Sequence, residues 1–427
     1  MLASKASAAR SISRIARSYA TAIDTAGLKV AAVDPSQPTA AVTVVVKAGS
    51  RYETKPGVAH ALKNFAFKST AKRTALGTIR ESELYGGVLS ASHSREHLAL
   101  TAEFLRGDEE FFVDVLTSFI TSGKFTRHEF EEYVQPVVES ESHAATSDPT
   151  THAIEVAHTL AFRSGLGSSL FASPHSSITA SDIKSYAASA FSKGNIAVIG
   201  SGIDQSSLAK LVEKALASAS TSSAPTTTAS SYFGGETRLE AHSGAQTVFV
   251  GFGAAGAPTP ELATLAAHLS TQSSVKWSKG LSPIASSIPH GSSVQSVYLP
   301  YSDATLFGYL IQSSTPSGVT EAGKIAIKAL KDATSAGGLK ADDIKRAVAK
   351  AKFAAASAVD SREGLAALVG SKILSGSEAS LDATFASLDK VNGAGVSKLA
   401  SSLIASKPTY VAIGDVHALP YADELGL

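Results

Sequence analysis

The chain has 427 residues, of which 44% are apolar and 18% charged, and its formal net charge at pH 7 is +1. This length predicts about two globular domains, and a charge so close to zero gives no general attraction for nucleic acid. The absence of cysteine excludes disulfides, thiolate nucleophiles and cysteine-bound metals, and no apolar run of about 18 residues predicts a transmembrane helix.

The N-terminal segment 1–19 has the composition of a mitochondrial transit peptide. Its arginines recur at helical spacing on one face, serine is frequent, and no acidic residue occurs before Asp24. Such segments are typical of mitochondrial import signals, although a basic tail without structure has a similar composition. Residues Arg17, Tyr19 and Ala20 resemble the site that the matrix processing peptidase cuts. We therefore expect the mature chain to begin near Ala20.

The two halves of the chain repeat one another weakly. Three segments recur in the same order at an offset of 204 or 214 residues, which predicts a duplicated domain. The matching pairs are 43–49 with 247–253, 125–132 with 339–346, and 195–200 with 409–414.

The predicted elements also follow one order in both halves, from an apolar strand through a helix and a β-rich segment to long helices and a closing strand. The first half contains strands 28–33 and 42–48, helix 58–67, the β-rich segment 97–105, helices 109–122, 127–144 and 182–192, and strand 195–200. The second half contains strand 246–252, helix 260–269, the β-rich segment 297–313, helices 318–336, 341–358 and 381–405, and strand 409–414.

Segment 217–231, between the halves, consists of serine, threonine and alanine apart from Pro225. This composition predicts an exposed linker. We therefore place one domain at 22–216 and the other at 232–427. Because strands and helices mix without strict alternation, each domain is expected to be α+β, with a mostly antiparallel sheet and helices packed on one face.

Segment 57–70 strongly resembles the pitrilysin-like family of inverted zinc peptidases. Members of this family carry His-x-x-Glu-His on one helix turn, where two imidazoles bind zinc and the glutamate activates water. The resemblance covers both halves, is more specific in the first, and implies LuxS/metallopeptidase-like domains. The flanking segments that also match are 47–53, 72–74, 85–87 and 94–96.

The resemblance further implies that the metal site of the family is degenerate here. His60 matches the first ligand and Glu141 lies at the spacing of the third, but Lys63 and Asn64 replace the glutamate base and the second histidine. An ammonium beside the ion would repel zinc, and lysine is a poor base at neutral pH. We therefore expect no bound metal, no other cofactor and no peptidase activity. His60 is expected to be a structural helix residue, and Glu141 a surface or interdomain carboxylate.

Two further segments fit a metal motif literally. The segment from His93 to His97 has the pattern His-x-x-Glu-His, but it leads into a predicted strand, on which Glu96 would point away from both histidines. In the segment from His152 to His158, His152 and Glu155 would be neighbours on a helix, but His158 would be rotated away from His152. A solvated helix face is the favoured interpretation of that segment.

Membership of the pitrilysin-like family leaves three kinds of protein open. An active peptidase subunit is opposed by Lys63 and Asn64. The non-catalytic alpha-type subunit of the processing peptidase, which binds presequences, carries a glycine run, but segment 279–292 has only two glycines. The degraded site, this loop and the small-residue-rich second half favour the core proteins of the cytochrome bc complex, and among them the second.

The resemblance to these core proteins implies a scaffold role. Such a chain would support ubiquinol–cytochrome c reductase (complex III) as a peripheral subunit on the matrix side of the mitochondrial inner membrane. Its expected partners are core protein 1, cytochrome b, cytochrome c1 and the Rieske protein, in a dimeric complex.

Overall fold

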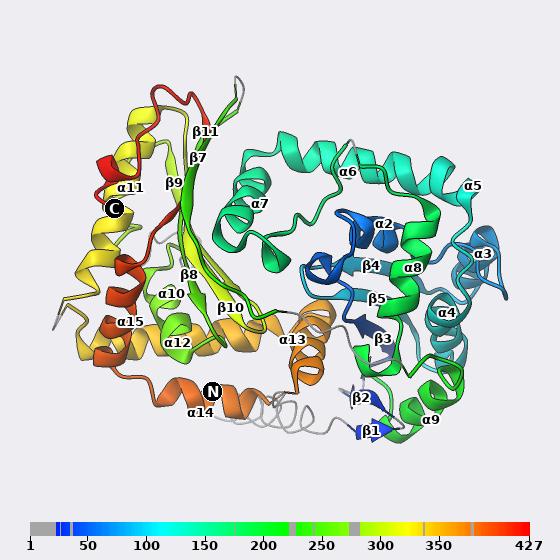
Figure 1. Cartoon of the computed structure of the whole chain (residues 1–427). Helices are drawn as coiled ribbons and strands as arrows, with labels where there is room; N and C mark the ends of the chain where they lie inside the picture. Colours follow the sequence, from blue (N-terminus) through cyan, green and yellow to red (C-terminus); the bar gives the residue numbers. More distant parts are fainter. Residues whose placement is uncertain are drawn as a thin grey trace. The chain divides into compact units, whose positions relative to one another are not determined.

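The computed structural model describes most of the chain, and the described residues form two compact units (Figure 1). The described ranges are 23–25, 27–34, 37–174, 176–221, 228–241, 244–272, 282–335, 338–376 and 380–427. The expected transit peptide and its cleavage site at Arg17, Tyr19 and Ala20 lie outside them. Residues 222–227 of the expected linker and 279–281 of the glycine-poor loop also lie outside the described residues.

The first unit is built on a six-stranded sheet in the order β1-β2-β6-β3-β5-β4. Strands β2 and β6 run parallel, and the other neighbouring pairs are antiparallel. The strands are β1 (Ile23–Thr25), β2 (Leu28–Val33), β3 (Thr39–Val46), β4 (Val88–His93), β5 (Leu98–Leu105) and β6 (Ile196–Ser201).

The second unit is built on a five-stranded sheet in the order β7-β11-β8-β10-β9. Its strands are β7 (Gly235–Glu240), β8 (Gln246–Ala255), β9 (Ser292–Pro300), β10 (Ala304–Ser313) and β11 (Thr409–Gly414). Again one pair, β7 and β11, is parallel and the rest are antiparallel. This order and these directions match β2-β6-β3-β5-β4 of the first sheet. The predicted α+β class with two homologous, mostly antiparallel domains is confirmed.

Alternate residues of the central strands in the first unit face two different layers of helices. In β3, Val42, Val44 and Val46 belong to the main core. Val45 points to the opposite face, where Gly370 of another helix approaches it. Helices that contribute to the main core include α2 (Val58–Asn64), α4 (Glu109–Ser122), α8 (Ala180–Ala190) and α9 (Gln205–Ala215), and the helix on the opposite face is α13 (Arg362–Ser375).

The sheet of the second unit is covered in the same way. In β8, Val248 and Val250 belong to the main core, whereas Phe249 belongs to a separate cluster on the opposite face. Helices that contribute to the main core include α10 (Pro260–Leu269), α11 (Pro316–Asp332) and α15 (Gly393–Ala405), and the helix of the separate cluster is α7 (Pro149–Phe162). Each sheet therefore has a second layer of helix in addition to the single layer expected from the sequence.

Helices α7 and α13 are exchanged between the two units. Helix α7 comes from the first half of the chain but packs on the sheet of the second unit, and α13 comes from the second half but packs on the sheet of the first. Residues 143–169, which include α7, belong to the second unit, and residues 355–383, which include α13, belong to the first. Figure 1 shows α13 in orange against the blue strands of the first sheet. The chain passes from the first unit to the second between residues 227 and 228, within segment 217–231, and two further segments are exchanged between the halves.

The remaining described helices are α3 (Ala75–Leu84), α5 (Arg127–Glu129), α6 (Gln135–Ser147), α12 (Ala341–Ala358) and α14 (Leu381–Asp389). The predicted helix 127–144 forms as α5 and α6, joined by a π-helical turn at Phe130–Val134. The predicted helix 381–405 is divided into α14 and α15. Within the described ranges, no helix combines the length and the apolar character that crossing a membrane requires.

Candidate functional site

Helix α2, which carries three of the four residues of the degenerate motif, is fixed at its start by backbone geometry and by a carboxylate. Gly57 precedes it with a φ of +87°, and a Cβ atom there would lie 2.5 Å from the Cβ of Ala172. The carboxylate of Glu53 accepts hydrogen bonds from the backbone N–H groups of Gly57 (3.0 Å) and Ala59 (3.4 Å). These N–H groups have no partner within the helix, so Glu53 caps its first turn.

Glu141 of α6 accepts hydrogen bonds from all three motif residues of α2. Its Oε2 accepts from His60 Nε2 at 2.6 Å and from Asn64 Nδ2 at 2.9 Å, and its Oε1 accepts from Lys63 Nζ at 2.6 Å. The structure thus brings together the four residues that the sequence places at the remnant site. Glu141 is ion-paired within the first unit, and its side chain remains 35% exposed.

The ammonium of Lys63 forms an ion pair with the Glu141 carboxylate. The ammonium nitrogen lies 2.6 Å from Glu141 Oε1 and 3.3 Å from Asn64 Oδ1, and only 18% of the Lys63 side chain is exposed. Carboxylate and amide oxygens are ligands of hard cations, and here both face an ammonium. A divalent ion at this position would meet a like charge in a partly buried environment, where solvent screens the repulsion poorly.

The imidazole of His60 is fully buried, and both of its nitrogens are engaged. The backbone N–H of Ala172 donates to Nδ1 at 3.2 Å, so the ring hydrogen is carried by Nε2 and donated to Glu141. A zinc-bound histidine has the opposite arrangement, because its second nitrogen donates to a carbonyl or carboxylate. The surroundings of His60 therefore favour a structural hydrogen bond over metal coordination. His93 and Phe171 pack on the ring, with centroids at 5.3 and 5.4 Å.

The electrostatics of the cluster favour one ion pair and neutral imidazoles. Burial alone would raise the pKa of Glu141, but hydrogen bonds from Lys63, Asn64 and His60 outweigh it and lower the pKa to about 2. Burial lowers the pKa of His60, against the effect of the hydrogen bond to Glu141. Burial also lowers the pKa of His93 to about 4, against the hydrogen bond to the Leu170 carbonyl.

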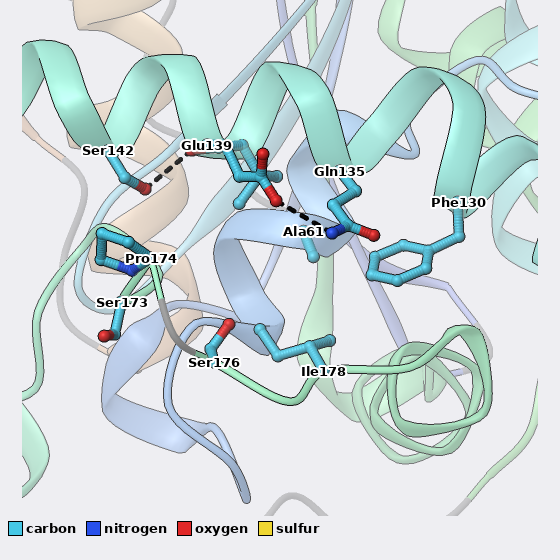
Figure 2. Close-up of a pocket in the computed structure, with 10 residues that line it drawn as sticks. Ala61, Phe130, Gln135, Glu139, Ser142, Ser173, Pro174, Ser176 and Ile178 are labelled. Carbon is cyan, nitrogen blue, oxygen red and sulfur yellow. Dashed lines mark hydrogen bonds between the residues drawn. The ribbon is translucent and has the colours of Figure 1, made fainter.

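A small cavity lies beside the motif, between α6, α2 and the segment that follows Ala172 (Figure 2). Gln135 Nε2 donates to Glu139 Oε1 at 2.9 Å along its wall. The cavity has a volume of about 60 Å³, which admits about two water molecules, whereas ligand sites occupy several hundred Å³. The lining residues are Ala61, Phe130, Gln135, Val138, Glu139, Ser142, Ser173, Pro174, Ser176 and Ile178.

The segment from His93 to His97 forms the turn between β4 and β5. His93 ends β4, and the N–H of Ser94 donates to the carbonyl of His97 at 2.7 Å. The segment runs into the expected strand, which is β5, but residues 94–97 form the turn before it and do not lie on the strand. Glu96 is buried, and its carboxylate accepts a hydrogen bond from Arg51 at 2.8 Å. This carboxylate is therefore engaged in a buried ion pair.

The segment from His152 to His158 lies on α7, and the interpretation as a solvated face is wrong for His158. This residue is buried in the second unit. Its Nδ1 lies 2.7 Å from the carbonyl of Ile154, to which it donates, and its Nε2 accepts from the hydroxyl of Tyr301 at 2.7 Å. One nitrogen thus bonds within α7, and the other links the helix to Tyr301, between β9 and β10.

Sequence reasoning missed two groups that shape the site. The N–H of Ala172 is a backbone donor and leaves no signal in the sequence. Glu53 leaves a weak signal, since a carboxylate shortly before a helix is a common cap. Across the described ranges, no cluster of three or more His, Asp or Glu side chains is arranged to hold a metal ion.

Comparison with known proteins is consistent with this geometry. Residues 29–173 match the model of the insulinase family, peptidase family M16. Subunit 2 of the mitochondrial cytochrome b-c1 complex from Cryptococcus neoformans is 44% identical over 99% of this chain and 98% of its own length. The same subunit from Yarrowia lipolytica is 38% identical over 96% of this chain and 97% of its own length, and that from Homo sapiens is 27% identical over 93% and 90%. The chain belongs to the family of the cytochrome b-c1 complex subunit 2 proteins, which are built on the M16 peptidase fold.

Proposed function

We propose that this chain is a non-catalytic structural subunit of the mitochondrial cytochrome b-c1 complex, the second core protein of ubiquinol–cytochrome c reductase. In this role it is a peripheral subunit on the matrix side of the inner membrane and supports assembly and stability of the complex. Its partners are core protein 1, cytochrome b, cytochrome c1 and the Rieske protein. The names of relatives that match nearly the full chain support this assignment.

The observation that carries the non-catalytic part of the proposal is the closed network at Glu141. A zinc peptidase needs an open coordination position and a carboxylate that activates water. Here the ammonium of Lys63 lies on Glu141 Oε1, and the N–H of His60 Nε2 points at Oε2. Neither a metal ion nor a general base has a place in this arrangement.

Zinc binding by the purified full-length chain tests this part directly. After equilibration with zinc and gel filtration, we expect no stoichiometric zinc by mass spectrometry and no peptide cleavage that a chelator abolishes. The double variant K63E/N64H is the matched control, because it restores the glutamate and the second histidine and should retain more zinc than the parent. Stoichiometric zinc with chelator-sensitive turnover in the parent would falsify the proposal.

The identity of the complex is tested by purifying the endogenous protein and identifying what co-migrates with it. We expect haem-containing partners of the cytochrome b-c1 complex. Co-migration with a single catalytic homologue that has an intact His-x-x-Glu-His motif would instead identify the alpha-type subunit of the processing peptidase.

A further inference from the structure

The chain contains three asparagines, all within the described ranges, and they differ in their access to solvent. Asn195 is fully buried, and Asn64 is half-buried, with its side-chain amide donating to Glu141 at 2.9 Å. Asn392, directly before α15, is exposed. The first two are each followed by a bulky apolar residue, whereas a glycine follows Asn392. Asn392 is therefore the asparagine whose side chain is open both to water and to the next backbone nitrogen.

Asparagine is a thermolabile residue, because its side-chain amide can react with its own backbone. The backbone nitrogen of the next residue attacks the side-chain carbonyl carbon, Cγ. A new C–N bond closes a five-membered succinimide ring, the bond from Cγ to the amide nitrogen breaks, and ammonia leaves with the proton of the backbone N–H. Water then opens the ring at one of its two carbonyl carbons, which yields either aspartate or isoaspartate. Water is the only co-reactant, and glycine promotes the first step because it carries no Cβ atom to hinder the attacking nitrogen.

In the folded chain, Asn392 caps α15, and this contact opposes the reaction. Its Oδ1 accepts a hydrogen bond from the N–H of Gly395 at 2.7 Å, and its backbone is extended, with φ of −120° and ψ of 158°. Ring closure requires rotation about ψ until the nitrogen of Gly393 lies on the same side of the Cα–C bond as Cβ. That rotation takes Gly393 out of the helix and breaks the cap, so the reaction requires the first turn of α15 to open.

The first turn of α15 is held by few contacts. Glycine is the poorest helix former after proline, and this turn contains both Gly393 and Gly395. These two residues and Ala394 are exposed or half-buried, and the first buried residue of the helix is Val396, in the main core of the second unit. Segments with few buried contacts open at low free-energy cost while the remaining structure stays folded. The turn before Val396 can therefore open while the rest of α15 remains packed.

We propose that Asn392 is a site of spontaneous deamidation, in which opening of the first turn of α15 lets the nitrogen of Gly393 displace ammonia from the side chain. Aspartate at this position keeps an oxygen that caps the helix. Isoaspartate routes the backbone through the side-chain carbon, so it misplaces the cap and loosens the start of α15. The modification goes beyond the proposed function and depends on no part of it.

Peptide mapping of the full-length chain tests the site. The chain is kept at neutral pH for several weeks and digested with trypsin, which releases the three asparagines in separate peptides, 64–68, 194–210 and 391–398. Relative to a sample digested at the start, we expect mass spectrometry to find conversion of amide to acid in peptide 391–398. Isoaspartyl methyltransferase should transfer a labelled methyl group to this peptide, because the enzyme recognises isoaspartate. If Asn392 retains its amide as completely as Asn64 and Asn195, the proposal is overturned.

Two substitutions show whether opening of α15 controls the reaction. Ala394→Gly leaves Asn392 and Gly393 unchanged but loosens the first turn, so it should raise the rate of amide loss about fivefold, the factor that corresponds to the difference in helix propensity between alanine and glycine. Gly393→Ala hinders the attacking nitrogen and strengthens the turn, so it should slow amide loss by at least about fivefold. A Cβ atom at Gly393 would lie 3.7 Å from Ile344 Cγ1, an ordinary contact, so this variant fits the fold.

The matched control is Ala188→Gly, the same substitution at an exposed position of α8 in the first unit. It should leave the rate of amide loss at Asn392 unchanged, and circular dichroism checks that every variant is folded. Equal rates for Ala394→Gly and the parent would contradict the proposal, because the helix would then not control the reaction. An equal rise in Ala188→Gly would contradict it for the same reason.

Discussion

At the scale of single residues, Glu53 is the group whose charge should control stability near neutral pH. Both of its hydrogen-bond donors are backbone N–H groups of Gly57 and Ala59. Burial raises the pKa of Glu53 from 4.5 to about 7, and these two hydrogen bonds only partly oppose the shift. Between these pH values the folded chain keeps a proton that the unfolded chain has lost. The stabilisation that the protonated Glu53 side chain gives to the folded state is therefore complete below about pH 4.5 and is lost as the pH rises through about 7.

Replacing Glu53 with glutamine should remove this pH dependence while keeping an oxygen that accepts from Gly57. We expect Glu53→Gln to be more stable than the parent at pH 8, by on the order of 1 kcal/mol, and no more stable at pH 4. Urea denaturation of both chains across this pH range measures the difference. Glu321→Gln, at an exposed position of α11, is the control and should leave the free energy of unfolding unchanged at both pH values. Parallel pH profiles for Glu53→Gln and the parent would contradict the assignment.

The remnant site shows how far residue-level prediction reaches. The grouping of His60, Lys63, Asn64 and Glu141 is predictable, because the family resemblance fixes their positions on two elements. The tautomer of His60 is not predictable, because it depends on a backbone N–H at Ala172, which is 112 residues away in sequence. Side-chain identity therefore predicts which groups meet, but not which of them donates.

At the scale of elements, α13 packs so closely on the first sheet that it requires a glycine. A Cβ atom at Gly370 would lie 2.8 Å from Val45 Cγ2 and 3.2 Å from Ile199 Cδ1. Other contacts fix the same helix, since Lys29 Nζ donates to the carbonyl of Ile373 at 2.7 Å and Arg362 pairs with Glu103. The position of α13 therefore depends on the absence of a side chain at residue 370.

Replacing Gly370 with valine should push α13 away from the sheet. We expect Gly370→Val to lower the free energy of unfolding by about 2 kcal/mol, which is typical when extra carbon atoms enter a packed interface. Urea denaturation with the full-length chain provides the measurement. Gly194→Ala is the matched control, because a Cβ atom there meets no atom within 4 Å. Equal stability of Gly370→Val and the parent would show that the helix is not packed as described.

The elements differ in how well their sequences predict them. Strands β3 and β8 are predictable because continuous apolar runs such as Val44, Val45 and Val46 indicate burial on both faces. Helices α7 and α13 were missed, because local patterns give no reason to pair a segment with a sheet from the other half. The link between Lys29 and Ile373 joins residues 344 positions apart. The sequence predicted only one helical layer per sheet because the second layer comes from the other half of the chain, where local patterns give no signal of it.

At the scale of the whole molecule, the exchange of α7 and α13 makes each unit depend on both halves of the chain. A cut within residues 222–227 would leave the first fragment with α7 but without α13. The face of its sheet that carries Ala41, Val45 and Ile199 would then lose its cover, although these residues are at most 3% exposed in the whole chain. The second fragment would likewise expose Phe249 and its neighbours. Exposed apolar faces of this kind promote aggregation.

We therefore expect fragments 1–227 and 228–427 to aggregate or to bind hydrophobic dyes when they are produced separately, and to co-purify as a soluble pair when they are produced together. An affinity tag on one fragment and gel filtration of the eluate measure this complementation. A second fragment that carries Gly370→Val should bind the first less tightly, because α13 is then the weakened contact. If each fragment is instead soluble and unfolds cooperatively by itself, the exchanged helices are dispensable. In that case the halves would be independent domains, as the sequence repeat alone predicts.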